Sequence, residues 1–127
     1  MPSLRNITPF FIVERITTSI EHYRDVLGFE VDVLIPSEDP FFAIVRRDKV
    51  QVMLKQIGPD TAPQPNHTRH EWARWDAYVD VDDPDALANE FESRGANFRE
   101  ELTDTDDGLR GFGVQDVDGY VIFFGRP

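Results

Sequence analysis

The sequence predicts an α+β fold in which an arrangement of one strand, one helix and three further strands occurs twice. Three observations favour this fold: two segments have helical periodicity, strand-like segments follow each of them, and the two halves of the chain align with each other. The 127 residues are about the usual size of one domain. We therefore expect a single domain of two βαβββ modules, about residues 1–57 and 72–127.

The first predicted helix follows Thr17-Thr18-Ser19. Thr18 and Glu21 have the spacing of a capping box, which indicates a helix start. One apolar stripe then runs along the segment at helical spacing: Ile16, Ile20, Tyr23 and Leu27. Gly28 is expected to end this helix, because glycine is favoured just past a helix C-terminus.

The second predicted helix begins at Asp83-Pro84, since aspartate is a good N-cap and proline fits the first helical position. Leu87 and Phe91 mark its buried face, and Arg94-Gly95 ends it. Ile20 aligns with Leu87 and Gly28 with Gly95, so the two helices occupy equivalent places in the repeat.

Strand-like segments lie around the two helices. They are residues 7–13, 29–35, 41–46, 50–55, 72–81, 97–102, 111–115 and 120–124. Asp118-Gly119 is a strong hairpin signal between the last two. Residues 58–71 hold three prolines and no apolar periodicity, so we expect them to be a connector between the modules.

Composition and charge narrow the possible partners. The chain has 13 Lys and Arg against 24 Asp and Glu, a net charge of −11, which disfavours nucleic acid and anionic membranes and favours cationic ligands. It has no cysteine, so disulfides and thiolate metal sites are excluded. The longest apolar run is five residues, far short of the ~20 that span a membrane. With no secretory signal pattern at the start, we expect a cytoplasmic protein.

Alternation along the strands predicts which side chains face a cleft. Two apolar sets should pack under the helices: Trp75, Ala77, Val79 and Val81, and Val50, Val52 and Leu54. The opposite faces combine into one surface that holds Phe10, Met53, Tyr78 and Phe123, with Arg74 and Asp76 among them. Such a mixed aromatic and charged surface fits either a small-molecule cleft or an ordinary solvated sheet face.

Residues 19–29 (SIEHYRDVLGF) and 112–124 (FGVQDVDGYVIFF) resemble the two signature segments of the vicinal oxygen chelate superfamily. That family includes glyoxalase I, extradiol dioxygenases and bleomycin resistance proteins. Residues 82–95 are similar to its second helix. The resemblance covers nearly the whole chain, and it implies cupped mixed sheets with helices on the outer faces and assembly as a homodimer.

The resemblance also gives expected metal positions, because the family's enzymes hold a divalent ion with His, Glu or Gln side chains. The equivalent positions here are Thr8, Met53, Asp76 and Phe123. One carboxylate with a hydroxyl, a thioether and a phenyl ring does not suit such an ion. We therefore expect no metal and no cofactor.

Two further possibilities involve titratable side chains. His67 and His70 could hold a metal only if the connector folded over the cleft. Asp76 could be a lone general base, but a carboxylate paired with Arg74 or Arg110 is the more common arrangement. We assign no catalytic residue.

The resemblance favours the metal-free branch of the family, typified by bleomycin resistance proteins. It implies a protein that sequesters an antibiotic or metabolite in a cleft at a dimer interface. The expected ligand is a small organic molecule, apolar or planar with a positive group, bound by Phe10, Met53, Asp76, Tyr78, Phe112 and Phe123. The alternatives are a glyoxalase-like lyase, isomerase or dioxygenase with a relocated metal, and a dimeric module with no small-molecule role.

Overall fold

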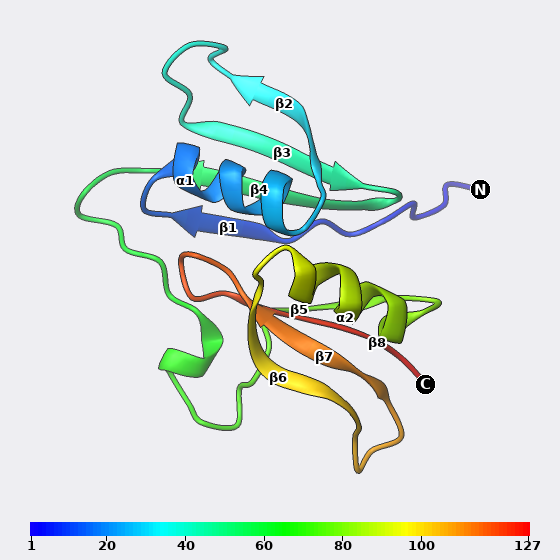
Figure 1. Cartoon of the computed structure of the whole chain (residues 1–127). Coiled ribbons are helices and arrows are strands. Elements are labelled where there is room, and N and C mark those ends of the chain that lie inside the picture. Colours follow the sequence, from blue (N-terminus) through cyan, green and yellow to red (C-terminus); the bar gives the residue numbers. More distant parts are fainter.

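The structure is a computed structural model that describes all of residues 1–127 (Figure 1). Its first module contains β1 (Phe10–Val13), α1 (Ile16–Glu21), the π-helical turn η1 (His22–Val26), β2 (Glu30–Ile35), β3 (Phe42–Arg47) and β4 (Val50–Gln56). Its second module contains β5 (Ala77–Asp80), α2 (Pro84–Ser93), β6 (Asn97–Asp104), β7 (Arg110–Gln115) and β8 (Val121–Arg126). The segment between the modules includes the short 3₁₀ turn η2 (Asn66–Thr68). Neither α1 nor α2 is long and apolar enough to cross a membrane.

The two modules have the same strand topology. The first sheet has the order β1-β4-β3-β2 and the second the order β5-β8-β7-β6. In each sheet the first strand of the module pairs in parallel with the last one, and the other neighbours are antiparallel. This repetition confirms the α+β fold of two βαβββ modules that the sequence predicts.

The predicted start of α2 and the last hairpin are confirmed. Asp83 is the N-cap of α2, and its side chain accepts a hydrogen bond from the backbone N–H of Ala86 at 3.0 Å. Pro84 is the first helical residue. Gly119 turns the chain between β7 and β8 with a φ of +94°, a conformation that glycine adopts without steric cost.

The predicted capping box of the first helix is wrong. α1 begins at Ile16, so Thr18 lies inside the helix and caps nothing. Distant side chains bind the start of the helix instead. Gln56 accepts the backbone N–H of Ile16 at 2.9 Å, and Asp118 accepts the N–H of Glu14 and the hydroxyl of Ser19 at 3.0 and 2.6 Å. Contacts from β4 and from the β7–β8 turn thus replace the local cap.

Two predicted strands are shorter than their sequence patterns. β5 starts at Ala77 rather than at Trp72, because residues 72–76 belong to the loop that enters the sheet. β1 starts at Phe10 rather than at Ile7. Proline has no backbone N–H to donate to a strand ladder, and Pro9 is the residue just before the observed strand.

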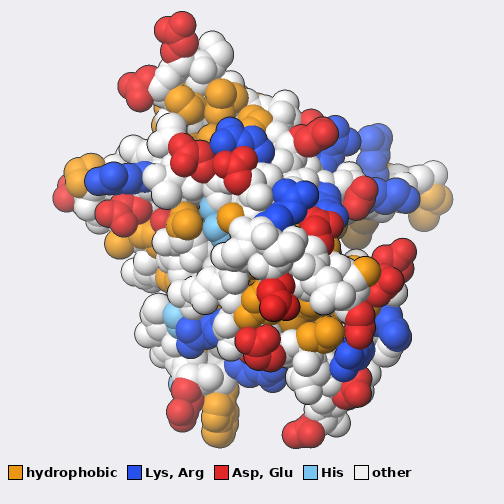
Figure 2. Space-filling view, viewed as in Figure 1, with side chains coloured by type: hydrophobic (Ala, Val, Ile, Leu, Met, Phe, Trp, Pro, Cys, Tyr) orange, Lys and Arg blue, Asp and Glu red, His pale blue; other side chains and the backbone are white.

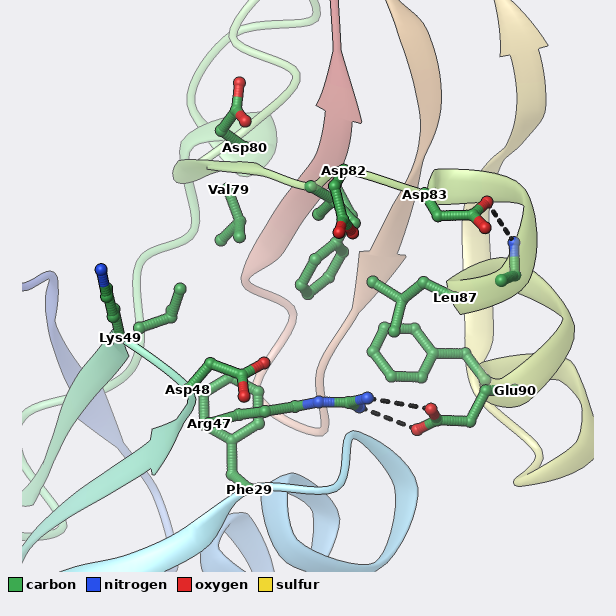
Figure 3. Close-up of a pocket in the computed structure, with 15 residues that line it drawn as sticks. Phe29, Arg47, Asp48, Lys49, Val79, Asp80, Asp82, Asp83, Leu87 and Glu90 are labelled. Carbon is green, nitrogen blue, oxygen red and sulfur yellow. Dashed lines mark hydrogen bonds and ion pairs between the residues drawn. The ribbon is translucent and has the colours of Figure 1, made fainter.

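An ion pair joins the two modules. The Arg47 guanidinium at the end of β3 donates two hydrogen bonds to the Glu90 carboxylate on α2, at 2.7 and 2.9 Å (Figure 3). Arg47 also donates to the backbone carbonyl of Leu27 at 2.9 Å. This bidentate contact fixes the end of β3 against α2, since paired guanidinium hydrogen bonds constrain orientation as well as distance.

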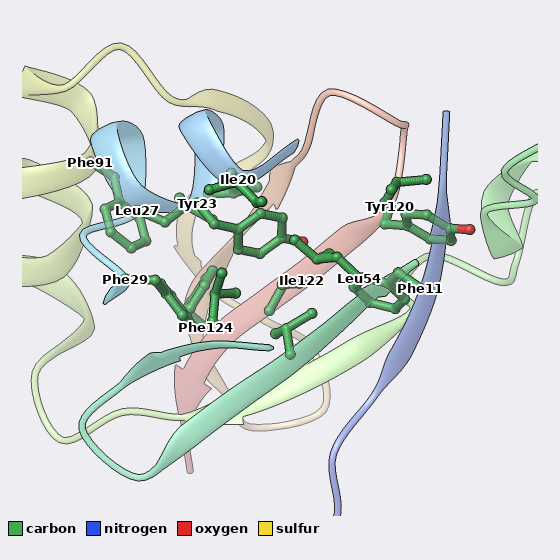
Figure 4. Packing of buried hydrophobic residues seen from close by; sticks show 14 of the residues in the cluster. Phe11, Ile20, Tyr23, Leu27, Phe29, Leu54, Phe91, Tyr120, Ile122 and Phe124 are labelled. Carbon is green, nitrogen blue, oxygen red and sulfur yellow. The ribbon is translucent and has the colours of Figure 1, made fainter. Parts of the chain in front are cut away.

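The hydrophobic core draws on both modules (Figure 4). The rings of Phe11 and Tyr120 stack with centroids 4.2 Å apart, and Phe91 of α2 meets Phe124 edge-on at 5.2 Å. The predicted alternation is confirmed in β4, where Val52 and Leu54 are buried. In β5 the matching side chains of Ala77 and Val79 pack against the core.

Each helix covers one face of its own sheet and leaves the other face free of helices. α1 packs on β3 and β4, and α2 packs on β6, β7 and β8. On the face shown in Figure 2, acidic side chains are spread over several places rather than gathered in one patch. The helix-free faces are therefore the surfaces on which the predicted ligand residues must be sought.

A buried polar pair lies at the contact between the modules. The Tyr23 hydroxyl of η1 donates to Oδ2 of Asp116 at 2.7 Å, and Oδ1 of Asp116 accepts the backbone N–H groups of Asp118 and Tyr120, each at 2.9 Å. Burial raises the pKa of Asp116 to about 7, because the loss of hydration outweighs these hydrogen bonds. Burial and the nearby Asp116 raise the pKa of Tyr23 as well.

Candidate functional site

The helix-free face of the first sheet carries apolar side chains that remain partly accessible. Phe10 of β1 is 52% exposed, and it lies opposite Met53 of β4 in the parallel pairing. The next residue in this row is Ile44 of β3, which pairs with Met53. The Phe42 ring lies 6.5 Å from the Phe10 ring between centroids. Phe10 and Met53 thus lie side by side on one face, as predicted.

The helix-free face of the second sheet carries three aromatic rings in contact, which we call the aromatic cluster: Trp75, Tyr78 and Phe123. The Trp75 and Phe123 rings stack with centroids 4.2 Å apart, and the Tyr78 and Phe123 rings lie nearly parallel at 5.9 Å. Phe123 is fully buried beneath its neighbours, whereas Tyr78 is 41% exposed. The cluster therefore offers part of its surface to a ligand, chiefly through Tyr78.

Trp75 is a member of the cluster that the sequence pattern assigned to the wrong face. The alternation placed it with Ala77 under α2, but β5 does not include it. In the loop before β5 its ring turns onto Phe123, and its indole N–H donates to Glu100 at 3.0 Å. Strand alternation does not extend to a residue outside the strand.

Glu100 of β6 and Arg74 form an ion pair at the border of the aromatic cluster. The guanidinium donates to both carboxylate oxygens, at 3.0 and 2.5 Å, and it lies over the Trp75 ring at 5.0 Å from the centroid. Glu100 is not among the site residues that the sequence predicts. No local signal marks it, because β6 pairs with β7 through register shifts on both sides of this residue.

Both carboxylate oxygens of Asp76 accept backbone hydrogen bonds. Its Oδ1 accepts the backbone N–H of Asn66 at 2.8 Å, and its Oδ2 accepts the N–H of Val121 at 2.8 Å. The carboxylate therefore ties the connector to the first residue of β8. It pairs with neither Arg74 nor Arg110, which bind Glu100 and Asp85 respectively.

Phe112 lies on the opposite face from the other predicted ligand residues. It pairs with Phe124 across β7 and β8, so the two rings share the face that α2 covers. Phe112 is fully buried and meets the Phe91 ring edge-on at 5.8 Å. It belongs to the core, and we remove it from the candidate site.

A groove of about 570 Å³ runs beside the aromatic cluster, at the seam between the modules. It is lined by residues 6–9 before β1, by the start of β4, and by residues 76–80 of the second module. Thr8, Asp76 and Tyr78 are among its lining residues. Partial desolvation and the neighbouring Asp80 raise the pKa of Tyr78, so its hydroxyl stays protonated as a hydrogen-bond donor.

The side chains at the family's metal positions do not fit a divalent ion. Of Thr8, Met53, Asp76 and Phe123, only Asp76 has a carboxylate, and both of its oxygens already accept backbone hydrogen bonds. The connector offers no replacement: His67 bonds the carbonyl of Gly119 at 2.8 Å, and His70 accepts the N–H of Trp72 at 3.1 Å. Nowhere in the chain do three or more His, Asp or Glu side chains converge as metal ligands would.

Comparison with known proteins gives one family and a set of similar structures. Residues 7–124 match the family model described as the glyoxalase/bleomycin resistance protein/dioxygenase superfamily. No curated protein sequence matches the chain significantly.

The similar solved structures cover nearly the whole chain at low sequence identity. TioX from Micromonospora sp. ML1 is 21% identical with a TM-score of 0.75, over 96% of this chain and 98% of its own. The bleomycin-binding protein of Streptomyces verticillus, in complex with copper(II)-bleomycin, is 22% identical with a TM-score of 0.70, over 100% and 99%. TnmS3, an antibiotic-binding protein from Streptomyces sp. CB03234, is 18% identical with a TM-score of 0.69, over 99% of both chains. At these identities the likeness shows the fold.

Proposed function

Because the chain belongs to the glyoxalase/bleomycin resistance protein/dioxygenase superfamily, we propose that it binds a small organic molecule of the antibiotic kind, without a metal ion. The observation that carries the proposal is the aromatic cluster on a sheet face that no helix covers. Two of the similar structures, the bleomycin-binding protein and TnmS3, are of proteins that bind antibiotics, which supports this ligand class.

The proposed binding is by contact alone. A planar ligand stacks on Tyr78, which rests on Phe123, and each such aromatic contact contributes about 1 kcal/mol beyond the burial of apolar area. Phe10 and Met53 supply a second apolar surface. Asp76 acts as a positioning residue that fixes the start of β8, since both of its oxygens are engaged. The net charge of −11 favours a ligand with a positive group.

We further propose that the protein is a homodimer in which the partner completes this site. Phe10 and Ile35 are 52% and 47% exposed, and their strand pairings place both on the helix-free face of the first sheet. Exposed apolar faces of this kind are typical of association surfaces. Sedimentation equilibrium at micromolar concentration should give twice the chain mass of 14.6 kDa, and a stable monomer would contradict the shared site.

Ligand binding is tested by thermal unfolding with bleomycin and with proflavine, a planar organic cation. A molecule that binds the folded state should raise the melting temperature in proportion to RT ln(1 + [L]/Kd), by several degrees at about 100 times Kd. Tyr78→Ala should reduce this shift, because it removes the exposed ring of the cluster. Trp72→Ala is the matched control, since Trp72 is an 82% exposed aromatic residue outside the cluster.

Two outcomes would count against the proposed ligand site. If Tyr78→Ala and Trp72→Ala reduce the shift equally, the ligand does not bind at the aromatic cluster. If neither compound shifts the melting temperature at millimolar concentration, sequestration of this ligand class is contradicted.

The metal-free character has its own test. We expect elemental analysis of the purified protein to find far less than one divalent ion per chain, because the expected ligand positions hold a single, already bonded carboxylate. About one tightly held ion per chain, lost on Asp76→Ala but retained in Asp106→Ala, would instead favour the enzymatic alternative. Asp106 is exposed and forms no ion pair, so its replacement controls for the loss of one charge.

A further inference from the structure

A second cleft lies on the opposite side of β8 from the aromatic cluster. It has a volume of about 790 Å³ and is enclosed by the β3–β4 turn, the end of β5 and the first turns of α2 (Figure 3). Phe124 lies at its floor, whereas the adjacent Phe123 belongs to the aromatic cluster. Successive strand residues point to opposite faces, so this cleft and the aromatic cluster lie on opposite faces of the second sheet. The cleft adjoins the groove beside the cluster, because Lys49, Val50 and Val79 line both.

The cleft has an apolar interior. The buried rings of Phe29, Phe91 and Phe124 form its floor, and the half-buried side chains of Val79 and Leu87 point into it from β5 and α2 (Figure 3). The floor combines residues from both modules. A ligand that fills it would bury apolar area against all three rings, which is the main source of affinity in such clefts.

The rim of the cleft carries an excess of negative charge. Three exposed carboxylates stand around it, Asp48 from the β3–β4 turn and Asp82 and Asp83 from the segment leading to α2. None of the three forms an ion pair. Lys49 is the one unpaired cation among the lining residues. The other basic residue, Arg47, is already neutralised by Glu90.

The walls of the cleft are held in place by the Arg47–Glu90 pair. Arg47 crosses from β3 to α2 at the base of the cleft and also lies over the Phe91 ring, 5.8 Å from its centroid. An apolar site whose walls are fixed before binding loses less free energy to ordering when a ligand enters.

We propose that this cleft binds a small organic cation with an apolar body, such as an aryl- or alkylammonium ion. The body fills the space over Phe29, Phe91 and Phe124, and the ammonium group lies at the rim among Asp48, Asp82 and Asp83. A neutral molecule of the same shape makes the same apolar contacts with the floor but gains no binding free energy from the rim carboxylates.

The test uses 2-phenylethylammonium and its neutral analogue 2-phenylethanol as probes. Their binding is measured through the amide chemical shifts of ¹⁵N-labelled protein. Both should shift the amides of Leu87 and Phe91, which line this cleft and not the groove, and leave those of Tyr78 and Phe123 unchanged. The ammonium probe should bind about tenfold more tightly at low salt, on the basis of several surface charge contacts. Added salt should remove most of that advantage, since the rim is exposed.

Matched charge variants distinguish the effect of the rim carboxylates on probe binding from the effect of the net charge of the protein. The triple variant Asp48→Asn, Asp82→Asn, Asp83→Asn should bind both probes equally, and asparagine at position 83 can still cap α2. The control triple variant is Glu38→Gln, Asp60→Asn, Asp106→Asn, which removes three exposed carboxylates away from the cleft and gives the same net charge. It should keep most of the preference for the cation. If both triple variants lose the preference, general electrostatic attraction explains it and the proposal is wrong.

Other occupants of the cleft give different results. If the amides of Leu87 and Phe91 shift with protein concentration in the absence of a probe, a second copy of the chain covers the cleft and the proposal is overturned. Shifts confined to Tyr78 and Phe123 would place the probe at the aromatic cluster instead. Tyr78→Ala should leave binding in this cleft unchanged, so the two proposed sites can fail independently.

Discussion

Replacement of Asp116 by asparagine is expected to remove one contribution to the pH dependence of stability, the fall in unfolding free energy that this carboxyl causes as the pH rises from 4 to 7. Burial raises the pKa of Asp116 to about 7 in the folded protein, whereas an aspartate in the unfolded chain titrates near 3.8. Below pH 4 the carboxyl is protonated in both states, so its contribution to stability is fully present. As the pH rises through 7 that contribution is lost, because ionisation is resisted only in the folded state.

The expected size of this effect is large for one side chain. Each pKa unit corresponds to about 1.4 kcal/mol, so the contribution of Asp116 to the free energy of unfolding should fall by roughly 4 kcal/mol over this range. In the protonated form Asp116 can donate to the Tyr23 hydroxyl and still accept the N–H groups of Asp118 and Tyr120 through Oδ1. Asparagine has the same shape and the same donor and acceptor pattern, which makes it a mimic of the protonated state.

Urea denaturation at pH 4.5, 5.5, 6.5 and 7.5 measures the effect. The difference between the unfolding free energies of the parent and Asp116→Asn should decrease steadily with pH. Asp106→Asn provides the control, since Asp106 is exposed and forms no ion pair. A parent and an Asp116→Asn variant with parallel pH profiles would show that this carboxyl is already ionised in the folded protein across the range.

Local patterns in the sequence predict those parts of the fold that short-range physics determines. Asp83 and Pro84 start α2 as their capping preferences require, and Gly28 and Gly95 follow their helices with φ of +75° and +81°. The alternation in β4 depends only on strand geometry, and Val52 and Leu54 are buried accordingly. The order of the elements then follows from the repeat.

Contacts between distant residues explain what local patterns miss. The start of α1 is set by Gln56 and Asp118, which the chain brings there only after both modules have folded. Strand alternation alone predicts that the Asp76 carboxylate faces a cleft. Its hydrogen-bond partners, Asn66 and Val121, lie in the connector and in β8. Neither pairing can be deduced from spacing along the chain.

The face of Phe112 was predictable from a signal that alternation alone does not use. A hairpin centred on Asp118 makes Phe112 the cross-strand partner of Phe124, and partners share a face. Phe123 pairs with Gly113 instead. Counting residues outward from the turn shows which residues of β7 and β8 are cross-strand partners. It assigns Phe112 to the core and Phe123 to the aromatic cluster, which alternation within a single strand does not.

Gly111→Ala is expected to lower the free energy of unfolding by about 1–3 kcal/mol, the usual cost of forcing extra atoms into a packed site. A Cβ at this position would lie 2.6 Å from Cε1 of Phe123 and closer still to the backbone carbonyl oxygen of Phe124. The ring could move, but the backbone of β8 is fixed by its pairing with β7, so the strain cannot be relieved by one rotamer change. Urea denaturation measures the loss, and Gly58→Ala is the control, because a Cβ there meets no atom within 4 Å.

The same substitution connects the packing of β7 to the aromatic cluster. When the added methyl group displaces the Phe123 ring, that ring must move relative to Trp75, whose ring stacks on it with centroids 4.2 Å apart. In a Trp72→Phe background Trp75 is the remaining tryptophan of two, so its fluorescence spectrum reports the movement directly. We expect Gly111→Ala to change that spectrum in the folded protein and Gly58→Ala to leave it unaltered. If Gly111→Ala is as stable as the parent and its spectrum is unchanged, Phe123 does not lie over Gly111, and the aromatic cluster loses the support proposed for it.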